Sequence, residues 1–352
     1  MTKPKILHYS SSYWPRIGGL PVTIRDIAHH TADHFEHHLM TRDLWRAGIS
    51  WERAPAGTDA SDPHLTVHRF YSDGEYLTGG MKKFLQEFDY DVLIIHSTHP
   101  SLLQATEHTK AKVIFMPQTK TRRPVRKFVD RIDHTFALLE SDKQHFIEHG
   151  IAADKITVLP RPVDMEIFKP PSSVLRDGVY HLLYAGRIAP EKRVWWLPEV
   201  LAKLRARSKR YTLDIIGDYD HPERDKPPLM EAIAAHEVKG SVHFSVAHTA
   251  EEMAAAYQAC DVLVSASITE TFGHVFTEAL ACGLAAVTTA QGGVREWAAP
   301  YVTFVDDVDG MVEAIEKAHP PLVPGLVWQR FWQKFSWQAR KAEFVGVVEG
   351  AL

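Results

Sequence analysis

Two glutamates, Glu270 and Glu278, stand eight residues apart in the stretch Glu-Thr-Phe-Gly-His-Val-Phe-Thr-Glu. A carboxylate accepts two hydroxyl hydrogen bonds at once, and the vicinal diols of sugars and ribose present such pairs. The apolar spacing after the first glutamate predicts a helix, and the free backbone N–H groups at a helix start favour a phosphate. Those N–H groups belong to Phe272, Gly273, His274 and Val275. The segment therefore predicts a site for a phosphate and a sugar.

A second candidate segment is the cationic turn Gly-Arg-Ile-Ala-Pro-Glu-Lys-Arg at 186–193. It follows an apolar run, 181–185, that reads as a strand, and it precedes a helical pattern. Arg187 and Lys192 at such a turn can neutralise the charge that a diphosphate leaving group gains as its bond to the sugar breaks. Two cations by chance would be solvated surface, but the glutamates downstream favour the functional interpretation.

A glycine pair, Gly18-Gly19, follows the first predicted strand, 6–10, and precedes a helix that begins near Pro21. Strand, glycine-rich turn and helix in this order are typical of a nucleotide-binding loop, although a glycine pair also serves any tight turn.

Alternating strand and helix patterns continue along the whole chain and predict an α/β fold with parallel sheets. We expect an N-terminal domain at 1–162, a proline-containing linker at 163–178, a second domain at 179–330 and a C-terminal helix within 331–352. A length of 352 residues exceeds one compact core, and the net charge of −4 gives no reason to expect nucleic acid as a partner. No apolar signal region opens the sequence, so we expect a cytoplasmic protein.

The pattern Glu-x-Phe-Gly-x-x-x-x-Glu, followed by Ala-Leu-Ala-Cys-Gly, resembles the signature of the large retaining glycosyltransferase family with the GT-B fold (group 1 type). That family includes glycogen synthase-like, sucrose synthase-like and mannosyltransferase-like enzymes. The turn at 186–193 is similar to the family's Gly-Arg-x-x-x-Glu-Lys-Gly turn. The resemblance implies two Rossmann-like, doubly wound domains facing each other across a cleft, with a final helix that packs back on the first domain.

The resemblance also implies roles for the residues of the two domains. Glu278 would bind the ribose of the nucleotide, Glu270 the donor sugar, and the loop at Gly18 and Gly19 the donor phosphates and the acceptor. The reaction would move a sugar from a UDP- or GDP-sugar to a hydroxyl of a glycan, a lipid-linked or a small-molecule acceptor, with retention at the anomeric carbon. It would proceed on one face of the sugar and require no metal or other cofactor.

Two histidines, His96 and His99, stand at the carboxyl end of the predicted strand 91–96, where open α/β sheets bind ligands. They are similar to the family's His-x-His region with one extra residue between them, which makes His99 a catalytic candidate and His96 a sugar-contact candidate. A structural histidine that caps a loop is the alternative for each. Gln118 stands near the place where relatives carry another histidine and is a further candidate for contact with sugar or acceptor.

A basic amphipathic stretch follows, in which apolar residues alternate with cations. It predicts contact with anionic lipid at the inner face of the cell membrane, while a solvated face or an acceptor-phosphate site is the alternative. The candidate cations are Lys120, Arg122, Arg123, Arg126 and Lys127.

Five histidines between positions 29 and 38 form a local cluster that we interpret as a surface group without a functional metal. They are His29, His30, His34, His37 and His38.

Two rival functions are compatible with the sequence. A nucleotide-sugar 2-epimerase of the same fold would recruit the histidines as acid and base. A protein that binds a nucleotide or glycan without turnover would keep the same ligand-binding residues.

Overall fold

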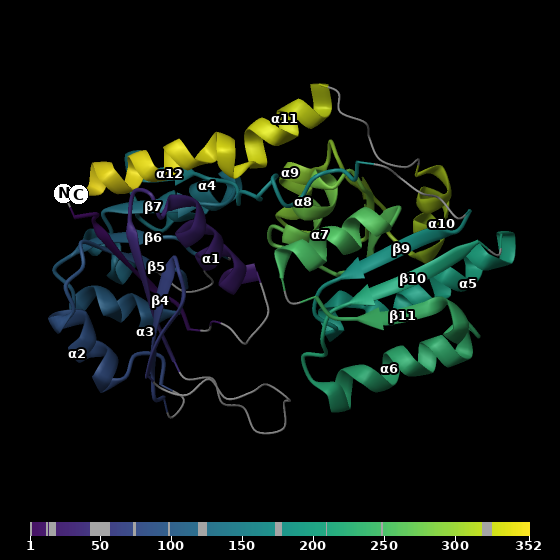
Figure 1. Cartoon of the computed structure of the whole chain (residues 1–352), viewed down its shortest axis with the longest axis horizontal. Helices are drawn as coiled ribbons and strands as arrows, with labels where there is room; N and C mark the ends of the chain where they lie inside the picture. Colours follow the sequence, from purple (N-terminus) through teal and green to yellow (C-terminus); the bar gives the residue numbers. More distant parts are fainter. Residues whose placement is uncertain are drawn as a thin grey trace. The chain divides into compact units, whose positions relative to one another are not determined.

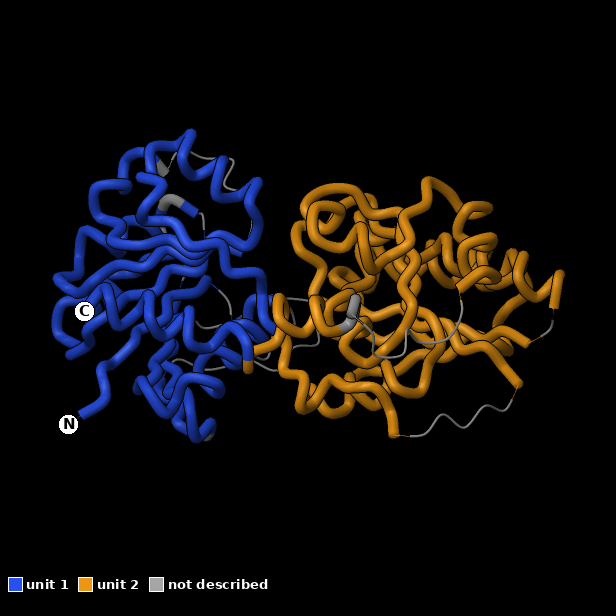
Figure 2. The backbone as a smooth tube through the Cα atoms, turned by 90° about the horizontal axis from the view of Figure 1, so that it is seen from above, with its two compact units in different colours: residues 1–162, 339–352 blue, residues 163–338 orange. Residues whose placement is uncertain are grey.

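The computed structural model describes residues 2–11, 13, 19–42, 57–72, 75–97, 99–118, 125–172, 178–208, 210–247, 249–318 and 326–352. The chain divides into two compact units (Figure 2). Unit 1 comprises Met1–Pro162 and Ala339–Leu352, and unit 2 comprises Val163–Gln338. Each unit is built around one sheet of largely parallel strands, which confirms the predicted α/β class.

The sheet of unit 1 has the strand order β3-β4-β2-β1-β5-β6-β7-β8. All neighbours pair in parallel except the edge strand β3, which pairs antiparallel with β4. The strand β3 was not predicted because its sequence, Gly-Thr-Asp-Ala-Ser-Asp, lacks the apolar residues that mark a strand. The strands are β1 (Lys5–Tyr9), β2 (Glu36–Arg42), β3 (Gly57–Asp62), β4 (Leu65–Phe70), β5 (Val92–Ile95), β6 (Lys112–Phe115), β7 (His134–Ala137) and β8 (Ile156–Val158).

Helices cover the two faces of this sheet with separate apolar cores (Figure 1). On one face, Ile24 and Ala28 of α1 pack with Leu39 and Val67. On the other face, side chains of α2 and α4 pack with residues of β1 and β5. Along β1, successive side chains alternate between the two faces, so His8 lies on the α1 face and its neighbours Leu7 and Tyr9 on the other. The helices of unit 1 are α1 (Gly19–Thr31), α2 (Gly79–Glu87), α3 (Pro100–Leu103) and α4 (Glu140–Glu148).

The sheet of unit 2 is parallel throughout, in the order β11-β10-β9-β12-β13-β14. A core on one face joins Leu182 and Tyr184 of β9 to apolar side chains of α5, α6 and α10. The strands are β9 (Tyr180–Ala185), β10 (Tyr211–Ile216), β11 (Val242–Ser245), β12 (Val262–Ser265), β13 (Ala285–Thr288) and β14 (Thr303–Phe304). The helices are α5 (Leu197–Arg207), α6 (Pro222–Ala235), α7 (Ala250–Ala259), α8 (His274–Ala281), α9 (Val294–Ala298), α10 (Val308–Lys317) and α11 (Leu326–Phe335).

The apolar pattern at 229–235 predicts a helix that starts at Leu229, but α6 begins well before that residue. Pro227 and Pro228 lie inside it, and prolines usually mark a helix boundary. The helix starts at Pro222, where proline is tolerated, and the Asp225 side chain accepts the N–H of His221. The expected start was therefore wrong, because the capping contacts lie ahead of the prolines.

The last helix, α12 (Trp337–Ala351), begins in unit 2 and ends in unit 1. Within unit 1, Phe344 stacks on Phe136 at 5.3 Å between ring centroids, and Lys341 forms an ion pair with Asp33 at 2.6 Å. Among the described residues, no helix is both long enough and apolar enough to cross a membrane.

Candidate active site

The carboxyl ends of β9 and β12 bring the two sequence motifs of unit 2 together. Parallel neighbouring strands end at the same edge of a sheet, so the loops after Ala185 and Ser265 lie side by side. The Ile268 N–H donates to the carbonyl of Glu191 at 2.8 Å, which ties the second loop to the first. One loop carries Lys192 and the other Glu270.

Lys192 and Glu270 form an ion pair of 2.5 Å between Nζ and Oε1. Their side chains are 17% and 15% exposed, so the pair is shielded from water but still reachable from the surface. Ser267 Oγ also donates to Oε1 of Glu270, at 2.9 Å. Both bonds that the described residues make to this carboxylate thus involve Oε1, and Oε2 can accept a ligand hydroxyl.

The backbone at Glu270 is held by the loop after β13. The Glu270 N–H donates to the Gln291 carbonyl at 2.9 Å, and the Gln291 N–H donates to the Ile268 carbonyl at 3.0 Å. At Gly292 (φ 93°) a Cβ would lie 2.8 Å from the carbonyl oxygen of Glu270, so only glycine fits there. The carboxylate is therefore fixed by a strand-like contact between two loops rather than by its own side chain alone.

Gly273 caps the start of α8 in the left-handed region, with φ 77° and ψ 70°. A Cβ on it would lie 2.6 Å from the Phe276 ring. Phe272 precedes it with its ring buried against Trp297, whose Nε1 donates to the Phe272 carbonyl at 2.8 Å. The Phe272 ring thus anchors the turn. Phe272 and its neighbours at the start of α8 can offer their backbone N–H groups to a phosphate.

Glu278 lies one helical turn beyond His274 on α8. Its Oε2 accepts the hydroxyl of Tyr257 at 2.8 Å, and its Oε1 lies 3.9 Å from Nδ1 of His274. Tyr257 is fully buried, and burial together with the Glu278 charge raises its pKa well above the usual value, so it stays a hydroxyl donor. Tyr257 on α7 therefore orients the carboxylate, and the sequence analysis missed this because the two residues meet only through helix packing.

Arg187 is held by two carboxylates, with Nη1 2.9 Å from Asp220 and Nη2 3.1 Å from Glu191. Its backbone carbonyl accepts the Tyr184 hydroxyl at 2.6 Å. Its side chain remains 39% exposed. The ion pairs fix the guanidinium at the same loop as Lys192.

Arg193 stands where the family's turn has glycine, and it adopts the left-handed conformation with φ 46°. Its Nε donates to the Ala266 carbonyl at 2.8 Å and its Nη2 to the Thr289 hydroxyl at 2.9 Å. The guanidinium also lies 3.9 Å from the centre of the Trp196 ring. These contacts offset the cost of the backbone conformation and link the loops after three strands.

In unit 1, the candidate residues gather at the carboxyl ends of β5 and β6. Gln118 Oε1 accepts Nη2 of Arg161 at 2.6 Å, and the same nitrogen donates to the Gly19 carbonyl at 2.6 Å. Arg161, only 6% exposed, therefore joins the start of α1 to the end of β6. His99 stacks on Tyr76 at 3.9 Å between centroids. Gly18 lies outside the described residues.

The described part of the basic stretch consists of two short 3-10 turns, Val125–Lys127 and Val129–Arg131. Arg126 and Lys127 are exposed, and Arg126 donates to the Glu148 carbonyl at 3.2 Å. Lys120, Arg122 and Arg123 lie outside the described residues.

The histidine cluster is not a surface group as a whole. His37 and His38 lie on β2 and are only 3% and 8% exposed, so that interpretation was wrong for these two. The residues on β2 are covered because the strand is internal to the sheet. His29 and His34 are exposed, and His30 is partly exposed.

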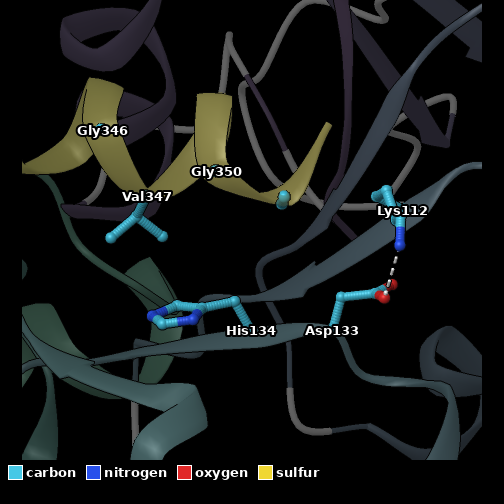
Figure 3. Close-up of a pocket in the computed structure, with 7 residues that line it drawn as sticks. Lys112, Asp133, His134, Gly346, Val347 and Gly350 are labelled. Atoms are coloured by element: carbon cyan, nitrogen blue, oxygen red, sulfur yellow. Dashed lines mark hydrogen bonds and ion pairs between the residues drawn. The ribbon is translucent and has the colours of Figure 1, made fainter.

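A hollow of about 330 Å³ lies in unit 1 at the amino ends of the strands β6 and β7 (Figure 3). Lys112 and Asp133, 3.3 Å apart, line it together with His134 and the helix α12. These residues precede or begin β6 and β7, so they lie at the amino ends of the strands, away from the candidate ligand-binding residues. We assign no role to this hollow.

Two family models match consecutive parts of this chain. Residues 17–167 match the family described as Glycosyltransferase Family 4, and residues 166–319 match Glycosyl transferases group 1. A D-inositol 3-phosphate glycosyltransferase of Pseudarthrobacter chlorophenolicus is 28% identical over 334 residues, which span 79% of this chain and 75% of that protein. The corresponding protein of Stackebrandtia nassauensis is 30% identical, over 62% of this chain and 52% of its own length.

Two solved structures share the fold over nearly the whole chain. A sucrose-phosphate synthase from Thermosynechococcus elongatus superposes with a TM-score of 0.76 at 16% identity, covering 99% of both chains. HepE of Anabaena, in complex with UDP and glucose, superposes with a TM-score of 0.75 at 17% identity, covering 99% of this chain and all of that one. This chain thus has the GT-B fold, in which a segment that matches Glycosyltransferase Family 4 precedes one that matches Glycosyl transferases group 1.

Proposed function

We propose that this protein transfers a sugar from a UDP- or GDP-sugar to a hydroxyl group of an acceptor, with retention at the anomeric carbon. The observation that carries the proposal is the shielded Lys192–Glu270 pair beside the start of α8. The pair supports the proposal because it offers a cation to a diphosphate and a carboxylate to sugar hydroxyls, on loops tied by a backbone hydrogen bond.

In this proposal, unit 2 holds the donor. The N–H groups of Gly273, His274 and Val275 and the cations Lys192 and Arg187 stabilise the charge that gathers on the diphosphate as the glycosidic bond breaks. Glu278, oriented by Tyr257, accepts the ribose hydroxyls, and Oε2 of Glu270 accepts a sugar hydroxyl. The departing phosphate takes the acceptor's proton on the same face, so catalysis consists of positioning and charge stabilisation and requires no metal.

Unit 1 would supply the acceptor contacts through His96, His99, Gln118 and the backbone at Gly19. The names of the relatives make D-inositol 3-phosphate one acceptor to test, beside glycans and lipid-linked sugars. The HepE complexes contain UDP or UDP-glucose, which makes a UDP-sugar the first donor to test. The exposed cations Arg126 and Lys127 are the described part of a proposed membrane or anionic-acceptor contact at the inner face of the cell membrane.

The test is a thermal-shift panel of UDP, GDP, ADP and their sugar conjugates on the parent, Glu278→Ala and Lys192→Ala. A ligand that binds the folded state raises the melting temperature by mass action. We expect one nucleotide to stabilise the parent and to lose most of its effect in both variants. The selected donor is then incubated with acceptors, and the anomeric configuration of the product is read by NMR.

The rival functions give different results in the same assay. A 2-epimerase converts its nucleotide sugar without an acceptor, and a binding protein gives a shift without turnover. Equal shifts in the parent and both variants would contradict the proposed donor site.

A further inference from the structure

Three buried imidazoles form a hydrogen-bonded row across neighbouring strands of unit 1. Nε2 of His96 lies 2.8 Å from Nδ1 of His8, and Nε2 of His8 lies 3.0 Å from Nδ1 of His37. The row continues from Nε2 of His37 to the hydroxyl of Thr31 at 3.0 Å, and from that hydroxyl to the Ile27 carbonyl at 2.7 Å. The three histidines are at most 3% exposed, and they come from β1, β2 and the end of β5.

The far end of this row fixes the direction of every hydrogen bond in it. The Ile27 carbonyl can only accept, so the single hydroxyl proton of Thr31 is donated to it. The Thr31 oxygen must then accept from His37, which therefore carries its proton on Nε2. The unprotonated Nδ1 of His37 accepts from Nε2–H of His8.

The same reasoning fixes the tautomers of His8 and His96. His8 is unprotonated on Nδ1 and accepts from Nε2–H of His96, which leaves Nδ1 of His96 as a lone-pair acceptor. Burial lowers the pKa of His37 and of His96 to about 3 and that of His8 well below its usual value, so all three rings are neutral at physiological pH. Because the row ends at the Ile27 carbonyl, a proton cannot be passed on at that end. The row therefore fixes the tautomer of each imidazole.

Nδ1 of His96 lies at a place suited to a ligand. Among the described residues this buried atom has no hydrogen-bond partner, and leaving a buried acceptor without a partner is unfavourable. His96 directly follows β5, which pairs with β1, and the strand order runs to β2 on one side of β1 and to β5 on the other. Such a reversal of strand order is where open parallel sheets bind ligands, at their carboxyl ends.

We propose that His8, His37 and Thr31 are positioning residues that hold His96 as the Nε2–H tautomer and so present Nδ1 as an acceptor for a ligand hydroxyl. The inference rests on the proposed function, which supplies a sugar or polyol hydroxyl as that donor. The inference gives His8, His37 and Thr31 a role although they do not contact the ligand. Substituting any of them would change the tautomer of His96. It also gives His96 a defined part, since a neutral Nδ1 can accept from a hydroxyl but cannot donate to one.

The tautomer is tested on the ligand-free protein by ¹⁵N NMR of the histidine side chains, with His96→Phe used to identify the His96 signals. Thr31→Val removes the hydroxyl at nearly constant volume, and Thr31→Ser keeps it as the matched control. We expect His96 to carry its proton on Nε2 in the parent and in Thr31→Ser, and to show a mixture of tautomers in Thr31→Val. A proton on Nδ1 of His96 in the parent, or unchanged tautomers in Thr31→Val, would overturn the proposal.

The ligand contact is tested by adding UDP-glucose, GDP-mannose or D-inositol 3-phosphate separately to the same samples. We expect one of them to shift the Nδ1 signal of His96 and to bind about tenfold more weakly to Thr31→Val than to Thr31→Ser, as loss of one hydrogen bond predicts. If turnover is found and both Thr31 variants keep the parent KM and kcat, or if no probe moves the Nδ1 signal, the positioning role is refuted. A protein without turnover that still shows the expected tautomers and shift would refute the proposed function and leave the positioning role supported.

Discussion

Lys192 Nζ lies 2.5 Å from Oε1 of Glu270, although the two residues are 78 positions apart in the chain. The pair joins the two motifs of unit 2 and stands at the edge of the sheet where ligands bind. Each charge compensates the other in a place where an isolated charge would be costly. In the proposed reaction, a diphosphate would therefore meet a lysine that Glu270 already orients.

Glu270→Gln and Lys192→Ala should each lower kcat by about 10²-fold or more, because each removes part of a preorganised charge arrangement. The double variant should lose less than the product of the two single losses, since the groups act as one unit. Steady-state kinetics with the donor found in the thermal-shift panel measures this. Lys203→Ala, which alters an exposed lysine paired with Glu199 and Asp309, is the control and should keep the parent rate. Fully multiplicative losses would show that the pair does not act together.

Tyr257→Phe should weaken nucleotide binding about tenfold and lower the unfolding free energy by about 1–2 kcal/mol, because Glu278 loses the donor that orients it. Calorimetric titration and urea unfolding measure the two effects. Tyr90→Phe is the control: its hydroxyl contacts Leu85 and Thr109 in unit 1, so it should cost stability only. Equal nucleotide affinity in Tyr257→Phe and the parent would remove Tyr257 from the site.

Gly273→Ala should destabilise the protein by more than about 1 kcal/mol and reduce donor binding. Alanine would have to adopt φ 77°, and its Cβ would lie 2.6 Å from the Phe276 ring, so the start of α8 must shift. Gly346→Ala is the opposite case, since nothing lies within 4 Å of its Cβ position in α12, and it should stabilise by about 0.5–1 kcal/mol. Thermal unfolding of both variants tests the pair, and a harmless Gly273→Ala would contradict the close approach at this turn.

Arg193→Ala should cost about 2–3 kcal/mol, because it loses the bonds to Ala266 and Thr289 and keeps the left-handed backbone. Arg193→Gly loses the same bonds but relieves the backbone cost, so it should be about 1 kcal/mol more stable than Arg193→Ala. Urea unfolding of the two variants gives the difference. The reverse order would mean that the turn imposes no backbone cost on Arg193.

Acidification should destabilise unit 1 through its buried histidines. His37 and His96 have folded pKa values of about 3, below the usual 6.5, so the unfolded chain binds more protons between these values. The unfolding free energy therefore rises with pH through this window and falls on acidification, by up to about 1.4 kcal/mol per pH unit for each histidine. Urea unfolding between about pH 5 and pH 7 measures the slope. His8→Gln should reduce the slope of unfolding free energy against pH by the contribution of one histidine. An unchanged slope would show that His8 is not held neutral.

Much of this protein could be predicted from its sequence. The alternation of strands and helices gave both sheets, because a buried strand and an amphipathic helix each leave a periodic apolar pattern. The turn 186–193 and the stretch 270–278 were recognisable because glycine, cations and carboxylates stand in them at the spacing of the family's motifs. The strand β3 and the early start of α6 were not predicted because their residues carry no such pattern.

Only the tertiary structure decided which side chains meet. Tyr257 orients Glu278, Arg161 joins Gly19 to Gln118, and His8 links two histidines of other strands, all through contacts between distant segments. Local sequence carries propensity and periodicity, whereas these partners depend on strand order, register and helix packing. For that reason the sequence by itself determined the two α/β sheets and which residues of unit 2 are candidates for ligand binding, whereas the folded chain decided how each carboxylate and imidazole is held.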